Sequence, residues 1–195
     1  MPENERRAEI MDAVERLLGR GGVNAVTMRA VASEAGVSLR LVQYYGKNKD
    51  ALLTATLDRL ADRSIERWRS RSERQGASGS AIDQVKAFLD EALPTDAASR
   101  GFHRVGVSLE ALAITHPGVA GQAYQVHLRA LADHLVRALR SDTHLSAAAA
   151  RLLALEVMGL AHGLGTLLMA DQLTESEAES LTADYLERLR PRLSH

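Results

Sequence analysis

The stretch "TMRAVASEAGVSLRLVQYYGKNKDALL", residues 27–53, decides the fold of the N-terminal part of the chain. Apolar residues recur in it at the helical spacings of three and four. Thr27 and Ser38 are good N-caps, and Gly36 stands where a helix often ends in a left-handed residue. The stretch therefore predicts two short helices, the first over 28–35, joined by the turn "GVS" as in a helix-turn-helix.

The second helix of the pair, about 39–45, has two different faces. At 100° per residue, four side chains share an arc of roughly 140°, and three apolar ones lie on the opposite side. The first set is Leu39, Arg40, Gln43 and Tyr44, and the second is Leu41, Val42 and Tyr45. A helix that only packed in a core would not need arginine and glutamine on one side. The outer face is therefore free to contact a partner.

The remaining chain has the same helical periodicity, and no stretch alternates with period two. We therefore expect an all-α protein with a helix-turn-helix domain over 1–49 and a second helical domain over 50–195. "GRGG" (19–22) ends the first predicted helix, and "TESE" (174–177) is a capping box for the last one. The helices outside the pair are predicted at about 5–18, from the residue after the N-cap Asn48 to about 74, and at 81–93, 103–115, 118–141, 147–170 and 175–190.

Composition limits the classes of protein that remain. The chain has 195 residues, is 46% hydrophobic and contains four prolines, which favours a packed globular protein. It has no cysteine, so disulfides and thiolate metal sites are excluded. The region 152–170 is apolar but is broken by Glu156, His162 and three glycines, so we do not interpret it as a membrane span. The start of the chain lacks the apolar run of a signal peptide, and we expect a cytoplasmic protein.

Three further patterns concern the second domain. Arginines at 59, 63, 67 and 71 form a row with spacing four, which we interpret as a solvated face with weak charge pairs. "QGASGS" (75–80) is the expected loop. The helix at 147–170 is apolar almost all round, and with the last helix it suggests an interface that one chain cannot cover. We expect a homodimer through about 147–190.

The N-terminal motifs resemble the DNA-binding segment of the TetR (tetracycline-repressor) family of bacterial transcription regulators. The resemblance rests on Thr27, the turn Gly36-Val37-Ser38, the pair Tyr44-Tyr45, and Lys47-Asn48-Lys49-Asp50 followed by Leu52-Leu53. The clear match covers about 8–55. Gly often stands in the family at the position of Arg40, Tyr at that of Gln43, and Phe or another apolar residue at that of Gly46. Gly46 therefore removes an expected apolar anchor beneath the second helix of the motif.

The resemblance implies a homodimer that presents two recognition helices to successive major grooves of a double-stranded, pseudo-palindromic DNA operator. Arg40 suits guanine O6 and N7, Gln43 suits adenine N6 and N7, and Leu39 suits a thymine methyl. The side chains that suit phosphates are Thr27, Ser38, Tyr44, Lys47 and Lys49, and Arg29 matches a DNA-contacting position of the family. We expect Arg40→Ala to relax specificity at one operator position, and Lys49→Ala to weaken binding evenly and flatten its salt dependence.

The resemblance also implies a small-molecule effector that binds among the later helices and competes with DNA through one conformational equilibrium. Mostly apolar walls with a few polar groups suit such a pocket. Each apolar candidate can equally be an ordinary core residue, and Glu110 is the preferred ligand-facing polar group. The candidates are Trp68, Phe88, His103, Val107, Glu110, Tyr124, Met158 and His162.

Net charge is −1, so any case for nucleic acid must be local. The histidines lack a ligand spacing that supports zinc, no phosphate-binding loop occurs, and neither a cofactor, a metal nor an enzymatic activity is expected. The prediction is a DNA-binding transcriptional regulator, most simply a repressor released by its ligand. The alternative is a helical dimeric module that binds a ligand or protein and has lost sequence-specific DNA binding, which Gly46 favours.

Overall fold

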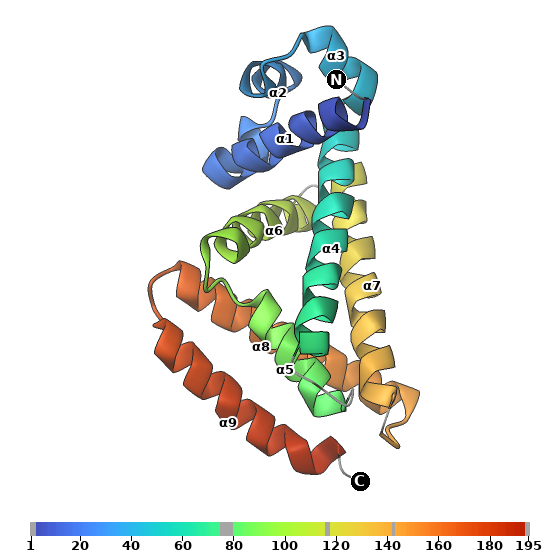
Figure 1. Cartoon of the computed structure of the whole chain (residues 1–195), viewed down its shortest axis with the longest axis vertical. Coiled ribbons are helices and arrows are strands. Elements are labelled where there is room, and N and C mark those ends of the chain that lie inside the picture. The colour runs from blue at the N-terminus through green and yellow to red at the C-terminus, as the bar shows by residue number, and fades with distance from the viewer. Residues whose placement is uncertain (1–2, 75–79, 116–117, 142, 194–195) are drawn as a thin grey trace. The chain divides into compact units, whose positions relative to one another are not determined.

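The computed structural model describes residues 3–74, 80–115, 118–141 and 143–193 (Figure 1). Every regular element among these residues is an α-helix, which confirms the predicted all-α class. The expected loop at 75–80 lies outside the described residues except for Ser80. The helices are α1 (Glu3–Ala25), α2 (Met28–Ala35), α3 (Leu39–Gly46), α4 (Lys49–Arg74), α5 (Ala81–Ala92), α6 (Ala97–Thr115), α7 (Val119–Arg140), α8 (Ala147–Met169) and α9 (Glu175–Leu193).

The helix ends follow the predicted capping chemistry. The Thr27 hydroxyl accepts a hydrogen bond from the Ala30 amide, and Gly36 ends α2 in the left-handed region with φ 65°. At the start of α9, the Thr174 hydroxyl accepts from the Glu177 amide at 3.2 Å, and the Glu177 carboxylate accepts from the Thr174 amide at 2.8 Å. The predicted capping box is therefore confirmed.

The first helix differs from the prediction at its C-terminal end. Instead of stopping at "GRGG", α1 continues to Ala25 through a kink at Gly21 and Gly22. Gly22 has φ 63°, which L side chains rarely adopt, so glycine allows the chain to bend here. The kink places one more turn, residues 23–25, between the long part of α1 and α2.

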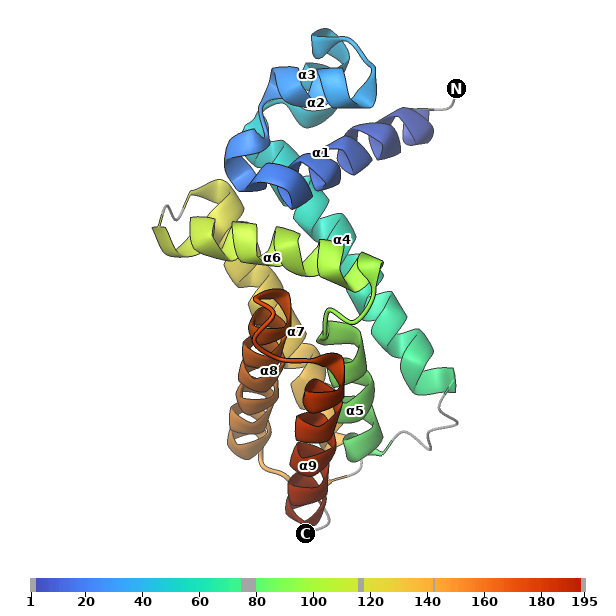
Figure 2. The same cartoon turned by 90° about the vertical axis from the view of Figure 1, so that its left-hand side faces the viewer.

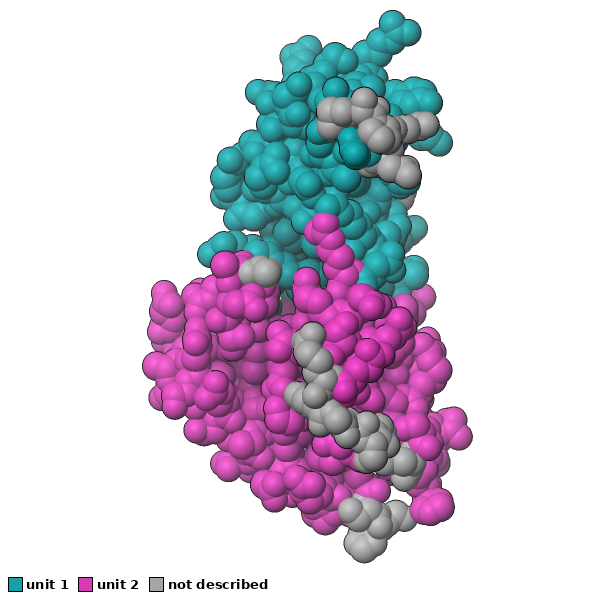
Figure 3. Space-filling view, viewed as in Figure 1, with its two compact units in different colours: residues 1–62, 101–127 teal, residues 63–100, 128–195 magenta. Residues whose placement is uncertain are grey.

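The chain divides into two compact units (Figure 3). Unit 1 comprises residues 1–62 and 101–127, and contains α1 to α3, the first half of α4, most of α6 and the start of α7. Its core joins these helices through fully buried side chains such as Ile10, Val31 and Val42. Within this unit, α2 and α3 lie next to each other on one side of α1 (Figures 1 and 2).

Unit 2 comprises residues 63–100 and 128–195. Its main core is built from Trp68 of α4 together with apolar residues of α5, α7, α8 and α9. Among the described helices, α8 is long and apolar enough to cross a membrane by length and composition. It nevertheless contributes buried residues such as Leu153 and Val157 to this core, which agrees with the expectation that this region is not a membrane span.

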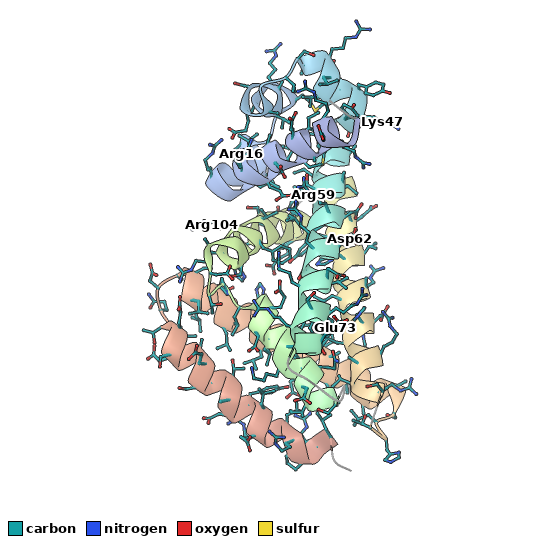
Figure 4. All side chains as sticks on the ribbon, in the orientation of Figure 1. Arg16, Lys47, Arg59, Asp62, Glu73 and Arg104 are labelled. Carbon is teal, nitrogen blue, oxygen red and sulfur yellow. The ribbon has the colours of Figure 1, made fainter. Side chains whose placement is uncertain are left out.

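Three of the four arginines in the α4 row bond other helices and do not simply form the predicted solvated face, whereas Arg63 is exposed. In unit 1, Arg59 bonds the Asp12 carboxylate and the Ala8 carbonyl of α1. Figure 4 labels Arg59 on α4. In unit 2, Arg67 and Arg71 both bond the Glu91 carboxylate of α5, whose side chain is only 4% exposed. Arg59, Arg67 and Arg71 thus join helices within each unit, and the spacing of residues along one helix cannot reveal such partners.

Candidate nucleic-acid interface

The two faces of α3 are arranged as the sequence predicted. Val42 is fully buried in the core of unit 1, and Leu41 and Tyr45 pack against that core. Arg40, Gln43 and Tyr44 are exposed. Leu39 is half-buried and contacts the core, so only part of its side chain is open to a base methyl group. The helix therefore offers a guanidinium and a carboxamide to a partner while its inner side is held in place.

Tyr44 is the aromatic residue of this outer face, and 70% of its surface is accessible. Its ring meets the edge of Tyr45 at a centroid distance of 5.0 Å and an interplanar angle of 82°. Because Tyr45 packs against the core, this contact gives the exposed ring a defined position. The Tyr44 hydroxyl is thus available for the predicted phosphate contact.

Thr27 and Ser38 hold the first turns of α2 and α3. Each hydroxyl oxygen accepts a backbone N–H bond, from Ala30 at 3.0 Å and from Leu41 at 3.2 Å. A hydroxyl that accepts in this way keeps its own hydrogen for another acceptor. Both residues are exposed, so capping and the predicted phosphate contact are chemically compatible.

The end of α3 shows how the chain compensates for Gly46. This residue is buried, and a Cβ built on it would overlap the side chain of Leu52, which is itself fully buried. Leu52 of α4 therefore occupies the space in which a side chain at position 46 would lie. The apolar anchor beneath α3 comes from the following helix, and α3 runs to Gly46, one residue beyond its predicted end.

Charge on this surface is locally positive although the whole chain is nearly neutral. Arg29, Arg40 and Lys47 are exposed, and Figure 4 places Lys47 at the end of α3. Glu34 is the acidic residue of the stretch from α2 to the end of α3, and its carboxylate accepts from Arg16 at 2.7 Å and from Arg20.

The bonds from Arg16 and Arg20 hold the pKa of Glu34 below its ordinary value. The carboxylate is therefore charged near neutral pH and is neutralised by α1 rather than by the exposed cations. Glu34 therefore does not neutralise the exposed Arg29, Arg40 and Lys47.

Lys49 is the one predicted phosphate contact whose surroundings differ from the expectation. Its side chain is half-buried, and its ammonium donates a hydrogen bond of 2.7 Å to the carbonyl oxygen of Val23 in the last turn of α1. Sequence reasoning missed this partner because Val23 lies 26 residues away and after a kink that periodicity did not predict.

The eight effector-site candidates divide between the two units. In unit 1, burial and the negative charge of Glu110 raise the pKa of Tyr124 to about 12. His103 is half-buried on the same helix as Glu110. Val107 is 44% exposed, whereas an apolar residue that lines an enclosed pocket would be largely buried.

In unit 2, Trp68 and Phe88 form an edge-to-face pair with centroids 5.4 Å apart, and Met158 packs against the same core. The Trp68 indole N–H donates to the Gln84 carbonyl at 3.0 Å, so its polar atom is satisfied by α5. His134 is not among the predicted effector residues, and its ring centroid lies 5.0 Å from that of Trp68. His162 is exposed on α8.

The predicted effector residues lie apart from the hollow that the surface of unit 2 offers. A shallow hollow at the start of α9 is lined by Leu173, Ser176, Glu177, Ser180 and Leu181, and it contains none of the eight predicted residues. Within the described ranges, no group of three His, Cys, Asp or Glu side chains is placed to hold a metal ion.

Comparison with known families supplies the decisive observation. Residues 10–56 match the family model described as bacterial regulatory proteins of the tetR family, and residues 81–191 match that of the BetI-type transcriptional repressor C-terminal domain. The protein belongs to the TetR family. The predicted class of DNA-binding transcriptional regulator agrees with both descriptions, and the family is regulatory rather than enzymatic.

Individual relatives of this TetR-family protein match over a limited part of the chain. An uncharacterised HTH-type transcriptional regulator of Xanthobacter autotrophicus is 42% identical over 65 residues, covering 33% of this chain and 32% of the relative. The HTH-type transcriptional regulator BetI of Brucella anthropi is 44% identical over 55 residues, or 28% of each protein. The matched region thus spans about a third of these relatives at most.

Solved structures share the fold over nearly the full length. A putative TetR-family regulator from Rhodococcus sp. superimposes with a TM-score of 0.82 at 21% identity, covering 97% of this chain and 99% of that one. A putative transcriptional regulator from Saccharomonospora viridis, solved in complex with choline, gives a TM-score of 0.70 at 20% identity and covers 96% of each chain.

Proposed function

We propose that this TetR-family protein is a cytoplasmic homodimeric repressor that binds a palindromic DNA operator through α3 and leaves it when a small molecule binds. The observation that carries the proposal is the division of α3. Arg40 and Gln43 are exposed on one side, whereas Val42 is fully buried on the other. A rigidly seated helix with two bidentate side chains outward has the chemistry that reads base edges in a major groove.

Phosphate contacts would position this helix on the duplex. Arg29 and Lys47 are exposed cations, and the hydroxyls of Thr27, Ser38 and Tyr44 can donate to phosphate oxygens. Lys49 was predicted to join this set, and its bond to Val23 suggests the different role argued below.

A second copy of the chain is the proposed partner of α8 and α9. The outer face of these helices exposes Leu152, Leu155, Leu167 and Leu181, each with at least 44% of its surface accessible. Leucines at such spacing on one helix pair would be covered in a homodimer with two-fold symmetry. Two recognition helices related by that axis would match the two halves of a palindrome.

The effector is proposed to be a small molecule that contacts some of the eight candidate residues. Choline in the Saccharomonospora viridis structure makes choline the first compound to test. A cation would be attracted by the Glu110 carboxylate, and the neighbouring Tyr124 stays protonated at neutral pH because its pKa is raised to about 12. The remaining candidates are Trp68, Phe88, His103, Val107, Met158 and His162.

The alternative of a dimeric module without sequence-specific DNA binding depended on Gly46. Leu52 fills the space beside Gly46. The missing side chain at position 46 therefore gives no reason to expect a loosely held recognition helix. The repressor is therefore the better-supported proposal.

Selection of bound sequences from randomised duplex DNA tests the proposal that the protein is a repressor. Enrichment of an inverted repeat, followed by release of the selected DNA on addition of an effector, is the expected result. Salt-sensitive binding without any enriched motif would contradict the proposal and favour the alternative. The genes beside the selected operator would indicate which compounds to try after choline.

A further inference from the structure

We infer that Lys49 positions the recognition helix instead of contacting a DNA phosphate. The ammonium of Lys49 donates to the carbonyl oxygen of Val23 at 2.7 Å, and we call this hydrogen bond the clasp. It lies within unit 1 and joins the first residue of α4 to the last turn of α1.

The acceptor of the clasp is an atom that needs such a partner. The last carbonyl groups of a helix have no amide of a following turn to bond, and the helix dipole makes them favourable neighbours for a cation. Besides the clasp, the Val23 carbonyl accepts a bond of 3.2 Å from the Val26 amide, the first residue after α1. A carbonyl oxygen has two lone pairs, so the ammonium can be its second and stronger partner.

The position of the clasp in the chain gives it a role in DNA binding. Val23 precedes α2 and Lys49 follows α3, so the bond closes the segment that contains the whole helix-turn-helix. Leu52 of α4 fills the space beside Gly46 and so holds the end of α3 against α4, the helix that Lys49 begins. Together these contacts determine where the outward side chains of α3 lie relative to α1 and α4.

The neighbouring Lys47 shows what a phosphate-binding lysine would look like here. Lys47 is exposed, whereas Lys49 is half-buried with its ammonium turned to the protein backbone. The two lysines of "KNK" therefore divide two tasks, one facing DNA and the other facing α1.

Amine labelling of the wild-type protein tests this division without any substitution. The chain contains three lysines, Lys47, Lys49 and Lys86, so each can be followed by peptide mass spectrometry. We expect Lys49 to react several-fold more slowly than Lys47 in the free protein, and operator DNA to protect Lys47 but not Lys49. Fast labelling of Lys49 in the free protein together with its protection by DNA would overturn the inference.

Matched variants give an independent test. Lys49→Met keeps the apolar stem but removes the donor. We expect affinity for the selected operator to fall about tenfold, while affinity for random DNA and the slope of log affinity against log salt stay unchanged. Lys47→Met should instead weaken binding to both DNAs and reduce that slope by about one. Lys49→Arg, which can still donate to the Val23 carbonyl, should recover most of the operator affinity.

The other outcomes count against positioning. If Lys49→Met lowers both affinities and the salt slope as Lys47→Met does, Lys49 contacts phosphate. If both affinities are unchanged, the clasp has no role in binding. If the variant loses its helical circular dichroism and both affinities fall together, Lys49 serves folding alone. Failure of the operator selection itself would be seen with the wild-type protein and is therefore distinguishable from each of these results.

Discussion

At the scale of single residues, chemically identical side chains acquire different tasks from their surroundings. Lys47 and Lys49 are two positions apart and suit phosphate equally well by type. One is exposed, and the other bonds a backbone carbonyl of α1. Arg40 and Arg59 differ in the same way, because Arg40 is exposed on α3 and Arg59 bonds α1. Residue type therefore limits the possible roles, and burial selects among them.

Gly46→Ala tests the contact between α3 and α4. The new Cβ would overlap the Leu52 side chain, and overpacking of this kind costs about 1–3 kcal/mol of unfolding free energy. Chemical denaturation followed by circular dichroism measures the loss. Gly106→Ala in α6 is the matched control, since a Cβ there meets nothing within 4 Å and should stabilise the helix by up to about 1 kcal/mol.

The same contact predicts non-additivity. Leu52→Ala alone should destabilise by about 2–5 kcal/mol, but it also makes room for the alanine at position 46. The double variant should therefore lose less stability than the sum of the two single variants. Additive losses would show that the two side chains do not share this space.

Arg40→Ala tests direct reading of a base. We expect the variant to lose about 1–3 kcal/mol of its preference for one base pair at one operator position, because the guanidinium fork is the group suited to guanine O6 and N7. Titration of operator variants, each with one base pair changed, measures the preference. Arg69→Ala is the control, since Arg69 is an exposed arginine of unit 2 and should leave the preference at every position unchanged.

At the scale of elements, pairs of helices are joined by charged contacts that periodicity does not show. The Glu156 carboxylate of α8 accepts from both terminal nitrogens of Arg192 at 2.9 and 3.0 Å and from the Tyr185 hydroxyl at 3.1 Å. Burial raises the pKa of Tyr185, so its hydroxyl stays protonated and donates. This cluster joins α8 to α9 beside the exposed leucines.

The cluster predicts a specific pH dependence. The bonds from Arg192, and then from Tyr185, hold the pKa of Glu156 below its ordinary 4.5. A depressed pKa means that the stabilisation is complete above the ordinary value and is lost as the pH falls through the lowered one. We expect the unfolding free energy of the wild type to fall more steeply with acid than that of Glu156→Gln.

Denaturation from pH 7 to about 3 measures both profiles. Glu179→Gln, at an exposed position of α9, should keep the wild-type acid profile. An unchanged profile for Glu156→Gln would instead mean that the cluster does not contribute to stability.

At the scale of the whole molecule, the proposed dimer depends on the outer face of α8 and α9. Leu155→Glu places a charge among leucines that a partner would cover, and Leu155 is already 46% exposed, so the single chain should still fold. We expect the dimer to weaken by about a hundredfold or more, with operator affinity falling in parallel. Analytical ultracentrifugation across a concentration series measures the first effect.

Val126→Glu provides the control for this substitution. Val126 is 59% exposed on α7 in unit 1, so it receives the same change in side chain outside the proposed interface. The control should remain a dimer. A dimer that survives Leu155→Glu would place the contact between copies elsewhere.

The sequence by itself determined most of the helix bounds and the two faces of α3, because caps, turn glycines and apolar spacing act within a few residues. Apart from α1, the exception is α6, which begins at Ala97 and not near residue 103 as predicted. The bounds of α2 were predicted without error, and those of α5, α8 and α3 to within one residue. The same local signals placed Arg40 and Gln43 outward and Val42 inward.

Only the tertiary structure decided the extension of α1, the seat of Gly46 against Leu52, the partners of the α4 arginines and the bond from Lys49 to Val23. These features depend on how one helix packs against residues that are distant in the sequence. Helical spacing cannot predict such contacts, because it describes the faces of one helix at a time.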